Sequence, residues 1–179
     1  KVPPKCGLMV SAHFGNFELP ARMAQHAGFT VHLVHRPANN PFVNRLINAQ
    51  RERCGAVMFK KGKTGVKQML EIAKNKDGII GMLVDQKTNT GIDVPFFGMP
   101  AKTTPFPANL ALKYNIPILC TKISRTKGAY FDIRISDPLP IKKHMTAQEI
   151  MTMIHTEFEK WIKETPEQWF WVHRRWGKE

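Results

Sequence analysis

Short apolar runs of strand length alternate with segments of helical period along the first two thirds of the chain. Five runs are rich in Val, Ile, Leu or Met, as buried strands are: residues 7–12, 29–35, 56–59, 78–84 and 116–123. Three segments place apolar side chains at helical spacing: residues 17–27, 41–54 and 64–76. This alternation predicts an α/β fold with a mostly parallel central sheet flanked by helices.

The last third carries its own signals. Residues 129–136 alternate in polarity, which predicts an antiparallel edge strand. Thr146 begins a capping-box pattern for a helix running towards Glu164, and Thr165 begins a second such pattern. Residues 95–100 have proline at both ends, so an apolar loop is predicted there. Because no linker or internal repeat interrupts these elements, a single domain is predicted over residues 1–179.

The charge of the chain indicates its class of partner. It has 27 Lys and Arg residues against 14 Asp and Glu residues, a formal net charge of +13. Its 42% of hydrophobic residues is enough for a packed core, which excludes a disordered basic tail. Nucleic acid, an anionic membrane surface and an acidic protein all remain candidate partners. Cys6, Cys54 and Cys120 lack zinc-site spacing, which indicates reduced thiols in a cytoplasmic compartment.

The most informative segment contains His13 and Glu18. On one helix they would lie about 140° apart, so they can meet only if His13 is on the turn after the first strand and Glu18 begins the next helix. Pro20 fits a first helical turn. A carboxylate on one imidazole nitrogen would leave the other as a base, and the N–H groups of the turn would stabilise an oxyanion. Alternatively, His13 caps the helix and Glu18 only complements its dipole.

Other polar residues lie near the same predicted edge. Asp85 directly follows the run 78–84, so in a parallel sheet it shares an edge with His13. It is a candidate for positioning a catalytic residue or for binding the acceptor, although an Asp after a strand is often a turn residue. Gln86 is a candidate amide donor there. In the terminal segment, Trp169 is expected to pack in the core, and Arg174 and Arg175 to lie on the surface.

Several blocks of the sequence resemble the lipid A biosynthesis acyltransferases, the late lauroyl- and myristoyl-transferases. The HX4(D/E) motif of that family corresponds to His13 and Glu18. The other blocks follow in the family's order across nearly the whole chain: residues 35–37 with 40–41, Arg51 before 54–55, 85–86, 94–98 with 103–104, and 166–169 running into 171–175.

The resemblance implies a glycerolipid/lipid A acyltransferase fold and O-acyl transfer from an acyl carrier protein thioester to a hydroxyl of a lipid A precursor. It places the enzyme at the cytoplasmic face of the inner membrane, with an anionic membrane surface as a further partner and with no metal or redox cofactor. It implies His13 as general base, Glu18 as its orienting partner, and Arg51 and Asp85 as further catalytic residues. The residues expected to bind substrate are Asn16, Arg36, Gln86, Phe97, Gly98, Thr103 and Arg174. Family members normally have an N-terminal membrane anchor region, so we expect this chain, which opens at Lys1 without Met, to be a fragment.

Two other functions compete with this hypothesis. A glycerol-phosphate type acyltransferase shares the HX4D motif, but its EGTRS-like segment is not found here. A non-enzymatic basic module for nucleic acid or anionic lipid predicts Lys and Arg clustered with exposed aromatic residues on one element. The charges are instead dispersed along the chain, so no nucleic-acid partner is expected.

Overall fold

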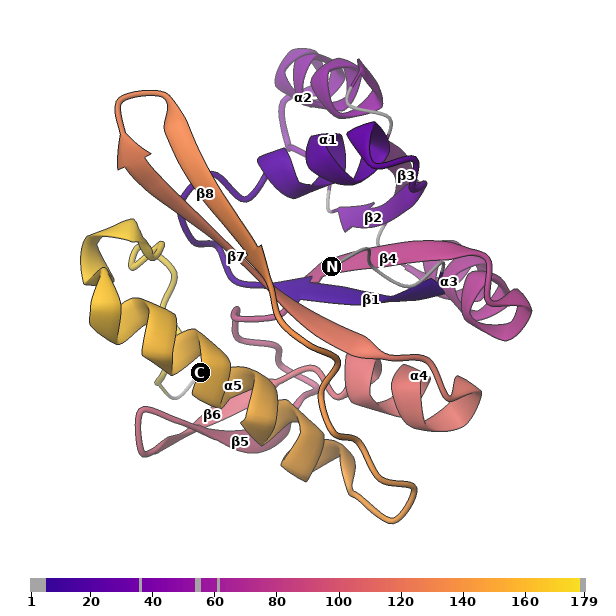
Figure 1. Ribbon diagram of the computed structural model, residues 1–179, viewed down its shortest axis with the longest axis vertical. Helices are drawn as coiled ribbons and strands as arrows, with labels where there is room; N and C mark the ends of the chain where they lie inside the picture. Colours follow the sequence, from indigo (N-terminus) through magenta and orange to yellow (C-terminus); the bar gives the residue numbers. More distant parts are fainter. Residues whose placement is uncertain (1–5, 36, 54–55, 61, 178–179) are drawn as a thin grey trace.

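A six-stranded sheet runs through the centre of the protein (Figure 1). The computed structural model describes residues 6–35, 37–53, 56–60 and 62–177. The strand order is β3-β2-β4-β1-β7-β8, and every neighbouring pair is parallel except β7 and β8. The strands are β1 Cys6–Ser11, β2 Val31–His35, β3 Ala56–Lys60, β4 Gly78–Leu83, β7 Ile118–Lys127 and β8 Tyr130–Ile135. The predicted α/β class and the antiparallel edge strand are therefore confirmed.

Helices cover both faces of this sheet. They are α1 Leu19–His26, α2 Pro41–Arg53, α3 Lys63–Asn75, α4 Phe106–Tyr114 and α5 Ala147–Glu164, with the 3-10 turn η1 Pro166–Gln168. Helices α1 and α2 lie on one side, and α3, α4 and α5 on the other (Figure 1). Helix α4, which has prolines at positions 105 and 107 around its start, was not predicted. The second capping pattern produces only the three-residue η1.

Two helix ends follow their sequence signals. Thr146 and Glu149 form both hydrogen bonds of a capping box at the start of α5, as predicted. Gly28, two residues after the end of α1, has a φ of 82°. The N–H groups of Gly28 and Phe29 donate to the carbonyl oxygens of Gln25 and Ala24 at 2.9 Å each, which is a Schellman motif.

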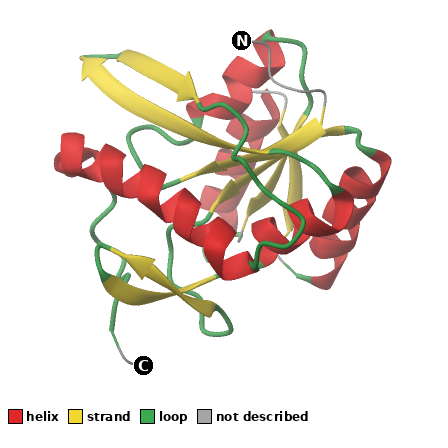
Figure 2. Ribbon diagram, turned by 60° about the horizontal axis from the view of Figure 1, so that its bottom comes forward, coloured by secondary structure: helices red, strands yellow, loops and turns green. Residues whose placement is uncertain are grey.

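The prediction of an irregular loop over residues 95–100 is wrong. The segment forms a two-stranded hairpin of β5 Ile92–Phe96 and β6 Met99–Thr103, which lies beside α5 (Figure 2). Phe97 and Gly98 make its turn with φ values of 52° and 75°, as a type I′ turn requires. In this register Pro95 faces Pro100 next to the closing pair, where the strands exchange no hydrogen bond, so neither missing N–H disrupts the ladder.

The core is divided unequally by the sheet. The larger apolar cluster joins Leu8 and Val10 of β1 to α3, α4, α5 and the hairpin, while the smaller joins Met9 to Ala24 and Val31 on the α1 side. Cys120 is fully buried and free, and burial raises the pKa of its thiol to about 12. In the described part of the chain, no helix combines the length and hydropathy needed to cross a membrane.

Candidate functional site

His13 and Asp85 meet where two neighbouring parallel strands end. Ser11 of β1 pairs with Leu83 of β4, so the residues two positions further along leave the sheet side by side. His13 Nδ1 lies 2.7 Å from Asp85 Oδ1, and the backbone N–H of His13 donates to Asp85 Oδ2 at 2.9 Å. The carboxyl edge of the sheet therefore holds an imidazole with a carboxylate on one of its nitrogens, the arrangement of an oriented general base.

Asp85 is buried and extensively hydrogen-bonded. Besides the two bonds from His13, Trp169 Nε1 donates to Asp85 Oδ2 at 2.9 Å. Burial by itself would raise the pKa of Asp85, but the hydrogen bond and charge of the His13 side chain, the Trp169 N–H and the His13 amide together lower it. Asp85 is thus an ionised acceptor that holds the proton of His13 on Nδ1.

The other imidazole nitrogen faces Gln86. Gln86 Nε2 lies 3.3 Å from His13 Nε2, and because the ring proton is on Nδ1, the amide donates to the lone pair of Nε2. Phe17 packs edge-on against the imidazole at a centroid distance of 4.9 Å, and Phe170 lies at 6.3 Å. Nε2 is the nitrogen available to accept a proton from a substrate.

Glu18 has a different partner from the one expected. Arg51 Nε donates to Glu18 Oε2 at 2.8 Å, and Arg51 Nη2 donates to Glu18 Oε1. Both nitrogens of the His13 ring have other partners, so the expectation that Glu18 bonds the imidazole is wrong. The physical reason is that α1 begins at Leu19, so Glu18 precedes the helix and its carboxylate meets Arg51 near the end of α2. A bidentate Arg–carboxylate pair results.

The C-terminal segment fastens the turn that carries His13. Gly15 N–H donates to the carbonyl oxygen of Gln168 at 2.8 Å, and Phe170 N–H donates to that of His13 at 2.9 Å. Gly15 has a φ of 55°, and a Cβ there would lie 2.3 Å from the carbonyl oxygen of Ile123, so only glycine fits. The amides of His13, Phe14 and Gly15 already donate within the protein, so the expected oxyanion site does not lie on these three groups.

A buried polar cluster lies behind the site. Arg175 is 2% exposed and donates to the carbonyl oxygen of Lys102 at 2.7 Å and to the hydroxyl of Thr103. The prediction that Arg175 lies on the surface is therefore wrong, whereas Arg174 is exposed as predicted. Burial lowers the pKa of Arg175 to about 10 and that of His155, 3.4 Å from Arg175 Nη2, to about 4. The cluster thus holds a charged guanidinium beside a neutral imidazole.

An apolar cavity opens beside Glu18 and Arg51, on the α1 side of the sheet. Its lining comes mainly from alternate residues of the strands: Met9, Ser11, Val31, Leu33, Met58 and Leu83. Phe17, which touches the His13 ring, also lines it. The cavity therefore joins an apolar space to the polar edge that carries His13 and Arg51, as a site for a long apolar substrate requires.

The other predicted substrate residues are distributed more widely. Asn16 lies on the turn, where its Oδ1 accepts from the Glu18 amide at 3.4 Å. Phe97 and Gly98 form the hairpin turn, and the Phe97 amide donates to Glu159 of α5 at 2.7 Å, so no contact of the described residues joins them to His13. The hydroxyl of Thr103 belongs to the buried cluster, where it accepts a hydrogen bond from Arg175. Arg36 lies outside the described residues.

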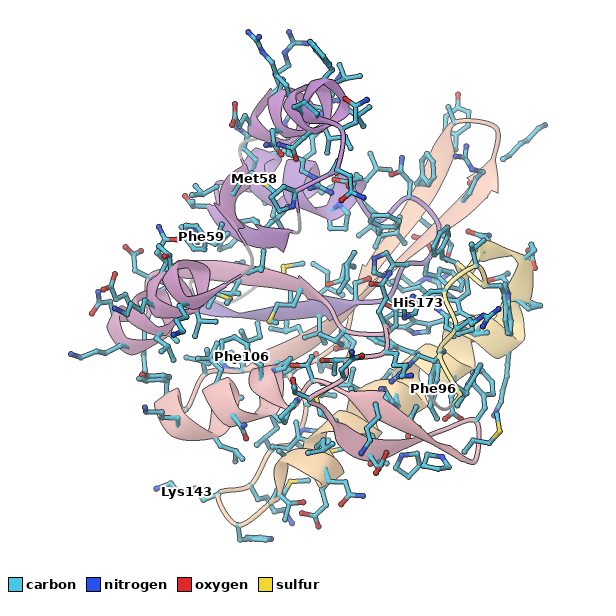
Figure 3. The ribbon with its side chains drawn as sticks, turned by 180° about the vertical axis from the view of Figure 1, so that it is seen from behind. Met58, Phe59, Phe96, Phe106, Lys143 and His173 are labelled. Atoms are coloured by element: carbon cyan, nitrogen blue, oxygen red, sulfur yellow. The ribbon has the colours of Figure 1, made fainter. Side chains whose placement is uncertain are left out.

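Sequence reasoning missed how the terminal segment supports the site. The segment that carries His173 lies against the hairpin that carries Phe96 (Figure 3). Trp169 packs edge-on to Phe96 with their ring centroids 5.7 Å apart. His173 Nε2 accepts the Lys87 N–H at 2.9 Å, which fixes the chain just after Gln86. The density of Trp, His and Arg after Pro166 was the available signal. Within the described residues, no group of three or more His, Cys, Asp and Glu is placed to hold a metal ion.

Comparison with known proteins identifies the family of the chain. A family model described as bacterial lipid A biosynthesis acyltransferase matches residues 6–178, nearly the whole chain. No curated protein matches the sequence. The match spans the turn with His13, the end of β4 with Asp85 and the terminal segment with Trp169. The chain therefore belongs to the bacterial lipid A biosynthesis acyltransferase family.

Proposed function

We propose that the protein is a lauroyl- or myristoyl-transferase that moves an acyl chain from an acyl carrier protein thioester to a hydroxyl of a lipid A precursor. The observation that carries this proposal is the 2.7 Å pair of His13 and Asp85 beside an apolar cavity. An oriented imidazole supplies the base that a hydroxyl nucleophile needs, and the cavity supplies an apolar lining against which part of a fatty chain would pack.

In the proposed reaction, His13 Nε2 removes the proton of the acceptor hydroxyl as its oxygen attacks the thioester carbonyl. The hydroxyl displaces the Gln86 amide from Nε2 when it binds. The tetrahedral intermediate then collapses, the C–S bond breaks, and the leaving thiolate takes the proton from His13. Asp85 keeps the Nδ1 proton in place and stabilises the imidazolium that forms between these steps. This chemistry uses no metal or redox cofactor.

Arg51 is proposed to stabilise the negative charge of the reaction. Its side chain is 21% exposed, and its guanidinium is held by Glu18 at the rim of the cavity. The nearest turn amides are already engaged, so the guanidinium is the better candidate for the oxyanion or for a phosphate of the acceptor. One such donor contributes about 3 to 4 kcal/mol in other acyl-transfer enzymes. Glu18 is then a residue that positions Arg51 rather than His13.

The proposed partners follow from the charge and the substrate. Acyl carrier protein and the phosphates of a lipid A precursor are negatively charged, as is the cytoplasmic leaflet, and the chain carries a net charge of +13. The proposed location is accordingly the cytoplasmic face of the inner membrane.

The test is acyl transfer from a lauroyl- or myristoyl-carrier protein to a detergent-dispersed lipid A precursor. We expect turnover by the wild type, loss of at least a thousandfold in His13→Ala, and no change in His26→Ala, which alters an exposed histidine at the end of α1. Glycerol 3-phosphate serves as the competing acceptor. Transfer to glycerol 3-phosphate alone would replace this proposal with the glycerol-phosphate type, and equal turnover in both variants would overturn the role of His13.

A further inference from the structure

Helix α2 differs from an ordinary surface helix, because most of the side chains that face the protein are polar. The half-buried residues of α2 are Asn44, Ile47, Asn48, Arg51 and the small Ala49, and the first four follow the spacing i, i+3, i+4 and i+7. Three of these four are polar. Asn44 Oδ1 accepts the Ala38 N–H at 3.0 Å, and Arg51 holds Glu18. Helix α2 is thus attached to the rest of the protein through polar contacts, and no residue of it is buried.

The opposite side of α2 is apolar and exposed. Phe42 is 83% exposed, Leu46 is 65% exposed and Val43 is 45% exposed. At helical spacing Phe42 lies about 180° and Leu46 about 140° from Arg51, whereas Val43 lies about 80° from it. Leu46 also borders a cavity that Arg51 and Glu18 line. Helix α2 lies at one end of the molecule, far from the β5–β6 hairpin (Figures 1 and 3). Isolated apolar residues are common on surfaces, but an apolar stripe on a helix with a polar inner side marks a binding surface.

The charge around this stripe is positive. Between Leu19 and Lys60, Glu52 is the only acidic residue. Arg45 and Arg53 are exposed on α2. On the helical wheel Arg53 lies between Phe42 and Leu46, and Arg45 lies at the edge of the stripe. Apolar side chains interspersed with arginines are typical of a helix that lies in the interface of an anionic bilayer.

We propose that the outer side of α2 inserts into an anionic membrane surface, with Phe42, Val43 and Leu46 at the boundary of headgroups and acyl chains. Arg45 and Arg53 would contact lipid phosphates. A bilayer fits better than an acidic protein, because charge complementarity alone leaves the exposed phenyl and leucyl side chains without an apolar partner. The proposal names a membrane contact for the proposed function, but binding to a membrane does not depend on acyl transfer.

This orientation has a consequence for substrate access. Arg51 lies on the side of α2 opposite to Phe42 and borders the apolar cavity with Glu18. A helix lying in the interface would therefore place the cavity entrance next to the lipid surface. A lipid acceptor would then reach His13 without leaving the membrane completely.

The test measures partition of the chain onto vesicles of phosphatidylethanolamine and phosphatidylglycerol, with phosphatidylcholine vesicles as the neutral comparison. We expect F42D/V43D to bind the anionic vesicles at least tenfold more weakly than wild type, because each large apolar side chain contributes about tenfold. Aspartate in the first turn of α2 is compatible with the helix dipole, so the fold is retained. Met99→Asp is the matched control, since it alters an exposed residue of β6 at 48% exposure and should bind as wild type does.

A second variant tests the charges. R45Q/R53Q should lose most of the preference for anionic over neutral vesicles. Unchanged binding of F42D/V43D would overturn the proposal. So would self-association of the wild type that F42D/V43D abolishes while vesicle binding persists, because a second copy would then be the occupant. F42D/V43D should keep wild-type turnover with detergent-dispersed acceptor, so a wild type without turnover counts against the proposed function alone.

Discussion

Two acidic residues of the site, Asp85 and Glu18, are held in opposite ways. Asp85 is 3% exposed and accepts hydrogen bonds from the ring and amide of His13 and from Trp169. Glu18 is 41% exposed and is bonded to Arg51, on a helix that has no buried residue. The carboxylate of Asp85 is therefore buried among its donors, and the carboxylate of Glu18 lies at the solvent-exposed edge of the site.

The HX4(D/E) motif led us to expect that Glu18 orients the imidazole of His13. In the structure Asp85 contacts the imidazole, and Glu18 holds Arg51 instead. A buried carboxylate with several donors can fix a tautomer, because it remains ionised and cannot rotate away. A half-exposed carboxylate on a cavity rim is suited to holding a guanidinium that meets incoming charge. The comparison predicts different kinetic consequences for the two residues.

The largest effect is expected for Asp85→Asn. An amide nitrogen facing Nδ1 favours the wrong tautomer of His13, so kcat should fall about a thousandfold to ten-thousandfold with little change in KM. Steady-state acyl transfer, together with a thermal unfolding curve to show that the variant is folded, measures this. A loss in Asp85→Asn smaller than that in Glu18→Gln would reverse the comparison.

Glu18→Gln and Arg51→Lys should each lower kcat about a hundredfold, because the guanidinium is misplaced or lost. Neither variant removes a donor to Asp85, so neither should change the pKa of Asp85. The double variant should be no worse than either single variant, since both act through one contact. Arg22→Gln, at an exposed position of α1, is the control and should retain kcat. If the losses of kcat in the two single variants added fully in the double variant, Glu18 and Arg51 would act independently.

The buried part of the site should also respond to pH. Burial lowers the pKa of His155 from 6.5 to about 4, so between these values the unfolded chain binds a proton that the folded protein does not. The free energy of unfolding should therefore fall by about 3 kcal/mol as the pH is lowered from 6.5 to 4. Chemical denaturation at several pH values measures this slope.

His155→Gln should flatten that slope, whereas His144→Gln, at an exposed position, should leave it unchanged. The lowered pKa of Asp85 adds a further loss of stability at still lower pH, below its ordinary value of 3.8. A wild-type stability that is constant from pH 6.5 to 4 would show that His155 is not held neutral.

The smallest effect is expected for Trp169→Phe. Phenylalanine keeps much of the packing against Phe96 but removes the N–H that donates to Asp85, so the pKa of Asp85 rises. The expected results are a loss of about tenfold in kcat and an acidic limb of the pH profile shifted to higher pH. Trp171→Phe is the matched control, because its N–H donates to the carbonyl oxygen of Pro166 instead. Equal pH profiles of kcat for the two variants would show that the Trp169 N–H has no effect on Asp85.

How far the sequence predicted this site depends on how local each contact is. His13 on the turn after β1, and Asp85 on the same edge, followed from where two apolar runs end. Their pairing did not follow, because β1 and β4 are neighbours only in the order β3-β2-β4-β1, with two strands between them in the chain. The proximity of Glu18 in sequence suggested the wrong partner for His13.

The same distinction applies to the fold. The β5–β6 hairpin was missed because the effect of Pro95 and Pro100 depends on which side of each strand exchanges hydrogen bonds, and that is set by register. The burial of Arg175 was missed because a guanidinium can enter a core only where carbonyl and hydroxyl acceptors from distant segments converge on it.

The sequence by itself determined the alternation of strands and helices, the parallel sheet, the edge strand β8 and the capping of α5, because each depends on residue spacing within one segment. Only the tertiary structure decided that Asp85 serves His13, that Glu18 serves Arg51, and that the apolar side of α2 faces outward. These features depend on which segments become neighbours and in which register, and hydrophobic periodicity carries no information about either.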